Sequence, residues 1–252
     1  MTFAVSAGAY DRFMGRFSVP LAERLVERAD VHAGQRVLDV GCGPGALTTK
    51  LVERLGTDSV SAVDPSPTFI DAVRARLPGI DVHRATAENL PFPDGAFDAA
   101  LAQLVVHFMK DPVAGIREMA RVTRRGGLVG ASVWDHAGGT GPLALFWQAA
   151  REVSPKAPDE SGLAGTGEGQ LTEIFSRAGL QDVQEDRLTV TVEFATFEDW
   201  WEPFTLGVGP AGSYVRSLDE AGRSALRERC EELLPHEPFE ITASAWCTLA
   251  RT

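Results

Sequence analysis

The chain has 252 residues, of which 44% are hydrophobic and 23% charged, as in an ordinary folded protein. Its formal net charge of −11 argues against binding to nucleic acid, because phosphate contacts need a basic surface. No apolar stretch approaches the roughly 20 residues that span a bilayer, and residues 1–6 lack the features of a signal peptide. With three scattered cysteines, we expect a cytoplasmic protein without membrane insertion.

Short apolar runs alternate with helical segments through the first half of the chain. Strands are predicted over residues 35–40, 59–63, 80–84, 97–103 and 128–133. Ser66-Pro67 and Asp111-Pro112 have the cap-then-proline pattern of helix starts, and Gly126-Gly127 is expected to end the second of these helices. This alternation predicts an α/β fold, with a doubly wound parallel sheet and helices on both faces.

The flanking segments predict one domain over residues 1–252. Upstream, an amphipathic helix is expected over 19–29, with Pro20 in its first turn. Downstream, helices are predicted over 143–153 and 170–178 with a surface loop between them, and strands over 187–194 and 241–249. The segment 195–240 between these two strands is too long for a simple turn, so it is predicted to be a cap over the active-site edge. Its Trp200 and Trp201 are expected to pack within the cap, with the alternative that one of them, such as Trp201, lines the cavity.

A glycine-rich turn joins the first strand to its helix in the sequence Val37-Leu38-Asp39-Val40-Gly41-Cys42-Gly43-Pro44-Gly45. Glycines allow a sharp bend and a close approach to a ligand, and the helix start offers free N–H groups. Asp64 ends the second strand, where a carboxylate accepts hydrogen bonds from a ribose diol. These features indicate an adenosine-type cofactor and leave a nicotinamide dinucleotide as an alternative.

Two residues of this turn favour S-adenosylmethionine over a nicotinamide dinucleotide. Asp39 lies two residues before the first glycine, where its charge would repel a pyrophosphate and attract an ammonium group. Pro44 removes one N–H group that a diphosphate would use. The methionyl end of S-adenosylmethionine carries such an ammonium group beside its sulfonium.

Four segments in this order resemble the class I S-adenosylmethionine-dependent methyltransferases, in the small-molecule branch that includes the ubiquinone/menaquinone biosynthesis methyltransferases. They are residues 37–45, Ala62-Val63-Asp64, Ala87-Glu88-Asn89-Leu90-Pro91-Phe92 and Phe97-Asp98. The resemblance covers residues 10–133, with a weaker continuation to the end. It implies a Rossmann-like, doubly wound, seven-stranded sheet whose last strand is antiparallel. Residues 1–34 would then cover the cofactor, 35–133 would form the binding core and 195–240 the cap.

The resemblance also implies a set of cofactor-binding residues: Arg16, Asp39, Gly41, Gly43, Gly45, Asp64, Pro65, Ser66, Thr86, Ala87 and Gln103. The glycines would pass beneath the methionyl part, Asp64 would hold the ribose hydroxyls, and Thr86 and Ala87 would meet the adenine. Gln103 would approach the methionyl amine through its backbone carbonyl, and Arg16 would bind the carboxylate. Thr86 stands where the family usually has Asp, so adenine recognition would depend more on the backbone of Ala87.

His107 is the predicted catalytic residue, because it follows the fourth strand at the edge where such sheets bind ligands and an imidazole titrates near neutrality. Asp135 and His136 follow the fifth strand and are further candidates. No residues have metal-ligand spacing. We expect methyl transfer to an O, N or C nucleophile of a small, partly apolar molecule, by a monomer or homodimer. The alternatives are a non-catalytic S-adenosylmethionine-binding regulator and an NAD(P)-dependent oxidoreductase.

Overall fold

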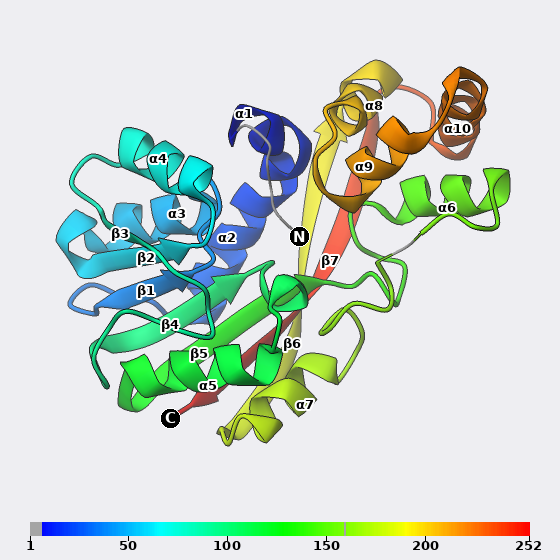
Figure 1. The fold of residues 1–252 in the computed structure, drawn as a ribbon. Coiled ribbons are helices and arrows are strands. Elements are labelled where there is room, and N and C mark those ends of the chain that lie inside the picture. The colour runs from blue at the N-terminus through cyan, green and yellow to red at the C-terminus, as the bar shows by residue number, and fades with distance from the viewer. Residues whose placement is uncertain (1–6, 159) are drawn as a thin grey trace.

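A seven-stranded sheet in the order β3-β2-β1-β4-β5-β7-β6 forms the centre of the computed structural model, which describes residues 7–158 and 160–252 (Figure 1). The strands are β1 (Val37–Val40), β2 (Val60–Asp64), β3 (Asp81–Arg84), β4 (Phe97–Gln103), β5 (Thr123–Trp134), β6 (Gln181–Phe194) and β7 (Phe239–Arg251). β7 pairs antiparallel with β5 and β6, and the pairs among β1 to β5 are parallel. The predicted fold class is therefore confirmed. The prediction about a signal peptide concerns residues 1–6, which lie outside the described residues.

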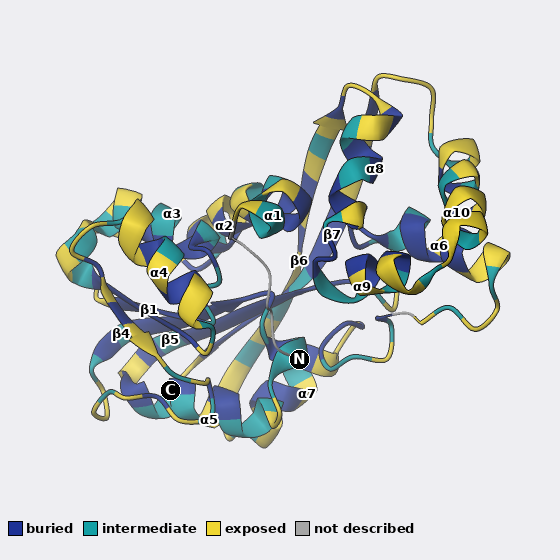
Figure 2. Ribbon diagram, turned by 45° about the horizontal axis from the view of Figure 1, so that its top comes forward, coloured by how far each residue is buried: buried dark blue, intermediate teal, exposed yellow. Residues whose placement is uncertain are grey.

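Helices cover both faces of this sheet (Figure 1). The helices are α1 (Ala7–Tyr10), α2 (Arg16–Arg28), α3 (Ala46–Leu55), α4 (Pro67–Arg76), α5 (Pro112–Val122), α6 (Ala144–Val153), α7 (Gln170–Arg177), α8 (Phe197–Thr205), α9 (Gly209–Ser217) and α10 (Glu220–Leu233), with the π-helix η1 (Asp11–Gly15) and the 3₁₀ turns η2 (Thr57–Ser59) and η3 (Val106–Phe108). Residues of α2, α3 and α4 share one apolar cluster and those of α5 and α7 share the other. Along β4, Ala99 and Leu101 join the first cluster and Ala100 and Ala102 the second, so the strands are buried from both sides (Figure 2).

The segment between β6 and β7, which is predicted to be a cap, folds into α8, α9 and α10. These helices lie beside the carboxyl end of β6 and the amino end of β7, and α6 packs against α10 (Figure 1). Phe146 of α6 stacks on Phe204 of α8, with ring centroids 4.5 Å apart and an interplanar angle of 8°. The cap is therefore a packed aromatic unit built from α6, α8, α9 and α10.

Three predicted boundaries are wrong. The strand expected over 187–194 begins at Gln181, whose partner in β7 is Arg251. The helix expected over 19–29 begins further upstream, because Phe13, Met14 and Phe17 extend its buried face. The helical elements α1, η1 and α2 follow one another from Ala7 to Arg28. Pro20 consequently lies inside α2. The strand expected at 128 begins at Thr123, which pairs with Phe97 before the register shifts at Ala99. The helix therefore ends at Val122, ahead of Gly126-Gly127.

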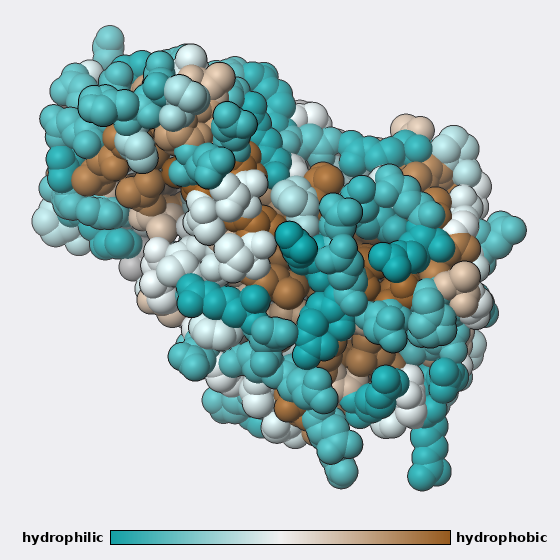
Figure 3. All heavy atoms as spheres, turned by 180° about the vertical axis from the view of Figure 1, so that it is seen from behind, coloured by the Kyte–Doolittle hydropathy of each residue, from teal (hydrophilic) through white to brown (hydrophobic). Residues whose placement is uncertain are grey.

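The outer surface is mainly polar. The side opposite to the view of Figure 1 shows hydrophilic residues with hydrophobic ones between them (Figure 3). The large hydrophobic residues that are exposed in the described part of the chain are Val19 and Val153. Within residues 7–158 and 160–252, every helix is too short or too polar to cross a bilayer.

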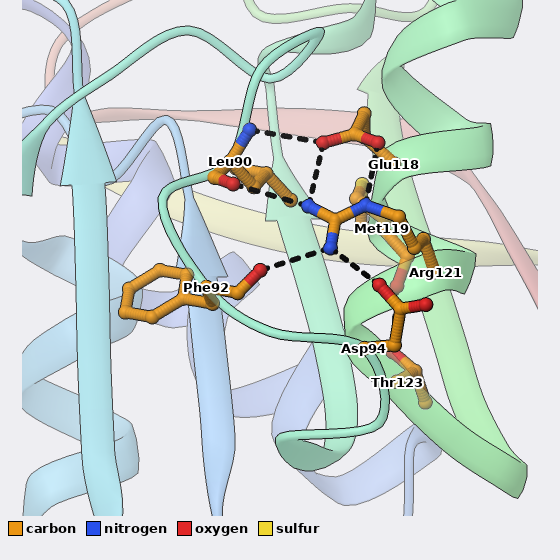
Figure 4. A network of polar contacts seen from close by, with 7 residues as sticks. All are labelled: Leu90, Phe92, Asp94, Glu118, Met119, Arg121 and Thr123. Atoms are coloured by element: carbon orange, nitrogen blue, oxygen red, sulfur yellow. Dashed lines mark hydrogen bonds and ion pairs between the residues drawn. The ribbon is translucent and has the colours of Figure 1, made fainter.

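One arginine fastens the segment between β3 and β4 to α5 (Figure 4). The Arg121 guanidinium donates to both carboxylate oxygens of Glu118, at 2.7 and 2.8 Å, and to Asp94 at 2.8 Å. It also donates to the backbone carbonyls of Phe92 (2.9 Å) and Leu90 (3.1 Å), and the Leu90 N–H donates to Glu118. This network fixes the segment that the resemblance assigns to adenine recognition.

Replacement of Arg121 tests how much this network stabilises the fold. Arg121→Ala removes charge-assisted hydrogen bonds and is expected to lower the free energy of unfolding by about 1.5–3 kcal/mol. Arg117 lies exposed on the same helix, and Arg117→Ala should change the free energy of unfolding by less than about 0.5 kcal/mol. Urea unfolding followed by circular dichroism measures both variants. Equal stability of the two would show that the network is energetically neutral.

Candidate functional site

The glycine turn lies at the carboxyl edge of the sheet, over the ends of β1 and β2. The N–H groups of Gly41 and Cys42 donate to the carbonyl of Val63 at 2.8 and 2.9 Å, so the turn crosses directly onto β2. Gly41 has φ = +73°, and a Cβ there would lie 2.5 Å from the side chain of Val105. Gly43 has φ = +53° and faces open space within 4 Å. The turn is thus packed on one side and open on the other.

Asp64 joins the two loops that follow β1 and β2. One carboxylate oxygen accepts from the N–H of Gly43 at 2.9 Å and the other from the N–H of Ser66 at 2.8 Å. Burial raises the pKa of Asp64, and these two hydrogen bonds oppose that rise. Because each oxygen has a second lone pair, Asp64 can organise the loop and still accept hydrogen bonds from a ligand diol.

Two buried oxygens beside the turn have no hydrogen-bond partner. Asp39 is 1% exposed, and its Oδ2 accepts from the hydroxyl of Thr48 at 2.6 Å while its Oδ1 has none. Burial is the main cause that raises the pKa of Asp39 to about 7. Gln103 donates from its amide to the carbonyl of Ser18 at 2.8 Å, and its Oε1 is buried without a partner. Both atoms are acceptors, so they fit a ligand that brings N–H donors, as an ammonium group does.

The residues expected near adenine lie along the same edge, after β2 and β3. Pro65 is exposed and Ser66 half-buried, while Thr86 is exposed and Ala87 is buried. Ser66 is the N-cap residue of α4, as its position predicts, but its side chain makes no capping hydrogen bond. The backbone N–H of Phe69 donates to the backbone carbonyl of Ser66 instead. The adenine contacts of these residues stay predictions.

Arg16 faces the cap. Its guanidinium donates two hydrogen bonds, of 2.9 and 2.6 Å, to the carboxylate of Asp199 in α8, and it lies over the ring of Phe194. Arg12 forms a second ion pair with Glu202 of the same helix. The N-terminal segment is therefore fastened to the cap, and the predicted contact between Arg16 and the cofactor carboxylate would use the remaining N–H groups of its guanidinium.

Two adjoining cavities lie beyond the carboxyl ends of β4 and β5. The smaller, of about 40 Å³, lies beyond β4 and β5 and has mostly apolar walls, among them Met14, Leu104, Trp134 and Pro210. The larger, of about 330 Å³, is lined by residues of the loop after β5 and of α6, such as Gly141, Trp147 and Gln148. His136 and Glu160 line both cavities. Such a concave, partly apolar space is the usual form of a small-molecule site.

His107 lines the smaller cavity, as expected from its position after β4. Its ring stacks near Phe108, and the centroid of His136 lies 6.3 Å away. Burial and the neighbouring His136 lower the pKa of His107 to about 3. The expectation that this imidazole titrates near neutrality is therefore wrong, because its surroundings keep it neutral at physiological pH.

The other candidates separate into cavity and scaffold residues. Asp135 is buried and accepts from the N–H of Gly138 (2.8 Å), the hydroxyl of Thr140 (2.7 Å) and the guanidinium of Arg187 (3.3 Å), so it shapes the loop. His136 lines both cavities. Trp200 and Trp201 are buried in the aromatic stack of α8 and line neither cavity, so they pack within the cap and the alternative of cavity lining is wrong.

Glu160 and Trp134 are among the cavity residues that sequence reasoning missed. Glu160 is 5% exposed and accepts a hydrogen bond of 2.9 Å from the indole of Trp147. It lies in a segment predicted to be a surface loop, and its sequence carries no signal of burial. Trp134 is the last residue of β5, so the rule that ligands bind at carboxyl edges would have found it.

S-adenosylmethionine fits the residues at this edge. The unpartnered oxygens of Asp39 and Gln103 suit its ammonium group, the open side of Gly43 admits a ligand, and Asp64 has lone pairs for a diol. The N–H groups of Gly41, Cys42 and Gly43 already donate to Val63 and Asp64, so these three are not available to a diphosphate.

Comparisons with known proteins agree with this geometry. The family described as "Methyltransferase domain" matches residues 38–130. An uncharacterized methyltransferase of Mycobacterium tuberculosis is 44% identical over 246 residues, which cover 94% of this chain and 87% of that protein. The chloroplastic 2-methyl-6-phytyl-1,4-hydroquinone methyltransferase 2 of Oryza sativa is 30% identical over 69% of this chain and 47% of its own length. A putative methyltransferase from an antibiotic biosynthesis pathway of Anabaena variabilis shares the fold, with a TM-score of 0.63 and 16% identity over 91% of this chain and 96% of that one.

The buried carboxylate of Asp39 gives the first prediction for this site. Because the raised pKa leaves Asp39 largely protonated below pH 7, it must lose its proton to pair with an ammonium group. Affinity for S-adenosylmethionine is therefore expected to rise with pH between about 5.5 and 7. Asp39→Asn should weaken binding by about 1.5–3 kcal/mol at pH 7 and above and remove this pH dependence. Above pH 7, where Asp39 is mainly charged, it should also raise the melting temperature of the free protein, since a buried charge without an ionic partner is gone.

Titration calorimetry across this pH range and thermal unfolding measure these effects. Asp58→Asn, at an exposed acid just before β2, is the control and should change neither. A binding curve of Asp39→Asn that keeps the pH dependence of the unaltered protein would assign the titration to another group.

Asp64 gives the second prediction. Asp64→Ala should weaken the binding of S-adenosylhomocysteine by roughly 1.5–3 kcal/mol, the typical value of a hydrogen bond to a charged group. An analogue without ribose hydroxyls should bind the unaltered protein more weakly than S-adenosylhomocysteine does. The Asp64→Ala substitution should lower the affinity for this analogue only slightly further, since both changes remove the same contact. Additive losses in calorimetry would mean that Asp64 acts only by holding the N–H groups of Gly43 and Ser66.

Proposed function

Because the chain belongs to the class I S-adenosylmethionine-dependent methyltransferases, and so is an enzyme that uses this cofactor, we propose that it methylates an O, N or C nucleophile of a small, partly apolar molecule. The observation that carries the proposal is the pair of adjoining cavities beyond β4 and β5, enclosed by N-terminal and cap residues such as Met14 and Pro210. Their walls suit a molecule with an apolar part and a few polar groups. The name of the rice relative describes such an acceptor, a phytyl hydroquinone.

The bound cofactor supplies a methyl group on a positively charged sulfur, which is already a good leaving group. The chain has to hold the acceptor in line with that methyl group and exclude water. Asp39, Asp64 and the glycine turn would fix the cofactor on one side. The cavity residues, with His107 and Trp134 among them, would align the acceptor on the other.

The N-terminal segment and the cap would close over this site together. Tyr10 lines the smaller cavity. Burial raises the pKa of its phenol and the charge of Asp64 adds to the rise, so α1 lies near the cofactor edge. The ion pairs of Arg12 and Arg16 with α8 couple this segment to the cap. We place the cofactor cover in residues 1–34, the binding core in 35–133 and the acceptor cover in 195–240.

A labelled-methyl experiment tests the proposal. The protein is incubated with methyl-labelled S-adenosylmethionine and a panel of phenols, amines and carbon acids, beside the small-molecule and macromolecular fractions of a cell extract. Label is expected in small molecules together with S-adenosylhomocysteine, and Asp64→Ala should slow its appearance. Label in the macromolecular fraction would contradict a small acceptor. Tight cofactor binding without any turnover would identify the non-catalytic regulator.

A further inference from the structure

Thr48 and Asp39 share a buried hydrogen bond beside the glycine turn. The hydroxyl of Thr48 donates to Oδ2 of Asp39 at 2.6 Å, and the two residues are 0% and 1% exposed. A carboxylate that is buried away from water is costly unless protein donors replace its lost hydration. Since Oδ1 of Asp39 has no partner among the described residues, the hydroxyl of Thr48 is the main donor that stabilises this carboxylate.

Two neighbouring threonines of α3 use their hydroxyl groups differently. Thr49 donates to the carbonyl of Gly45, four residues earlier, at 2.6 Å, which is a common bond for a threonine inside a helix. Thr48 instead donates out of the helix to β1, the strand that precedes the glycine turn. A valine has a similar shape and would fill the buried position 48 without the cost of burying a hydroxyl. The hydroxyl of Thr48 therefore serves the carboxyl of Asp39.

The surroundings of Asp39 disfavour its negative charge. Opposite it in the sheet lie the apolar residues Ala62 of β2 and Leu101 of β4. Burial raises the pKa of Asp39 to about 7, and the charge of Asp64 adds to the rise. Burial also raises the pKa of the Cys42 thiol, with further contributions from the charges of Asp39 and Asp64. Burial and the carboxylate of Asp64 thus both oppose a negative charge on Asp39, and the neutral thiol does not offset them.

We propose that Thr48 is a positioning residue for cofactor binding, whose hydroxyl holds Asp39 in one orientation and in its charged form. This inference rests on the proposed function, on its cofactor side, and takes the predicted role of Asp39 there as its premise. A negative charge beside the glycine turn attracts the ammonium group of S-adenosylmethionine. Because Thr48 is fully buried, it acts on the cofactor through Asp39.

Removal of the hydroxyl gives the expected signature. Thr48→Val keeps a similar shape, and the pH at which Asp39 loses its proton should rise by about one pH unit. Only the charged form attracts the ammonium group, so affinity for S-adenosylhomocysteine should fall about five-fold at pH 7. At about pH 8.5 the affinity should almost equal that of the unaltered protein. Thr48→Ser keeps a hydroxyl and should behave as the unaltered protein does.

Thr49→Val is the matched control, since it removes a neighbouring hydroxyl that donates to a backbone carbonyl. It should leave the pH dependence of binding unchanged. Asp39→Asn has no carboxyl to titrate, so adding Thr48→Val to it should cause no pH-dependent loss of affinity. Titration calorimetry compares each variant with the unaltered protein at the same pH, so that titration of the ligand itself cancels.

A merely structural role of Thr48 predicts a different result. Thr48→Val would then lose the same affinity at both pH values, and this outcome would overturn the inference. A Thr48→Ser variant that binds as weakly as Thr48→Val at pH 7 would also overturn it. Thermal unfolding confirms that each variant is folded, and Thr48→Ala replaces Thr48→Val in the same comparison if the valine variant does not fold.

Nuclear magnetic resonance of the free protein separates this inference from the proposed function. Side-chain ¹³C signals of labelled aspartate follow the ionisation of each carboxyl group, and Asp39→Asn identifies the signal of Asp39 by its loss. The midpoint of this signal should lie at about pH 7 in the unaltered protein and higher in Thr48→Val. An unchanged midpoint would overturn the inference. If no small molecule is methylated, the proposed function fails instead, and the coupling between Thr48 and Asp39 still stands.

Discussion

The contact between Gly41 and Val105 is the constraint on which the site depends. Any Cβ at position 41 would lie 2.5 Å from the Val105 side chain, so the loop after β1 and the segment after β4 can touch only through a glycine. That contact places the glycine turn beside η3, which carries His107. A cofactor on the turn and an acceptor in the cavity are thereby brought to neighbouring places, and methyl transfer requires this proximity.

A second level of organisation joins segments that are distant in the chain. Ion pairs link Arg12 and Arg16 to α8 and Arg28 to Asp186 of β6, while Phe13 packs edge-on against Phe204. The N-terminal helices therefore rest on both the sheet and the cap. Exposed ion pairs contribute little stability singly, but several of them around an aromatic contact define one relative position of cap and N-terminal segment.

The sequence predicts the sheet well because its signals are local. Each strand end is followed by a turn or cap residue, and Asp111 does accept a hydrogen bond from the N–H of Ala114, as its motif indicates. What the sequence does not predict depends on distant contacts. The extension of α2 follows from packing of Phe13 and Phe17, and the burial of Glu160 follows from its contact with Trp147. The lowered pKa of His107 follows from burial and from the nearby His136.

Several of the unsatisfied buried polar atoms in the described chain belong to this site: Asp39 Oδ1, Gln103 Oε1, His107 Nδ1 and Trp134 Nε1. Each lowers the stability of the free protein, typically by about 1–3 kcal/mol. A core of apolar residues at these positions would fold more tightly and bind nothing. The two oxygens lie beside the glycine turn, and the two nitrogens belong to residues that line the smaller cavity. A ligand that forms hydrogen bonds with these atoms removes this loss of stability, so binding at the site should raise the free energy of unfolding.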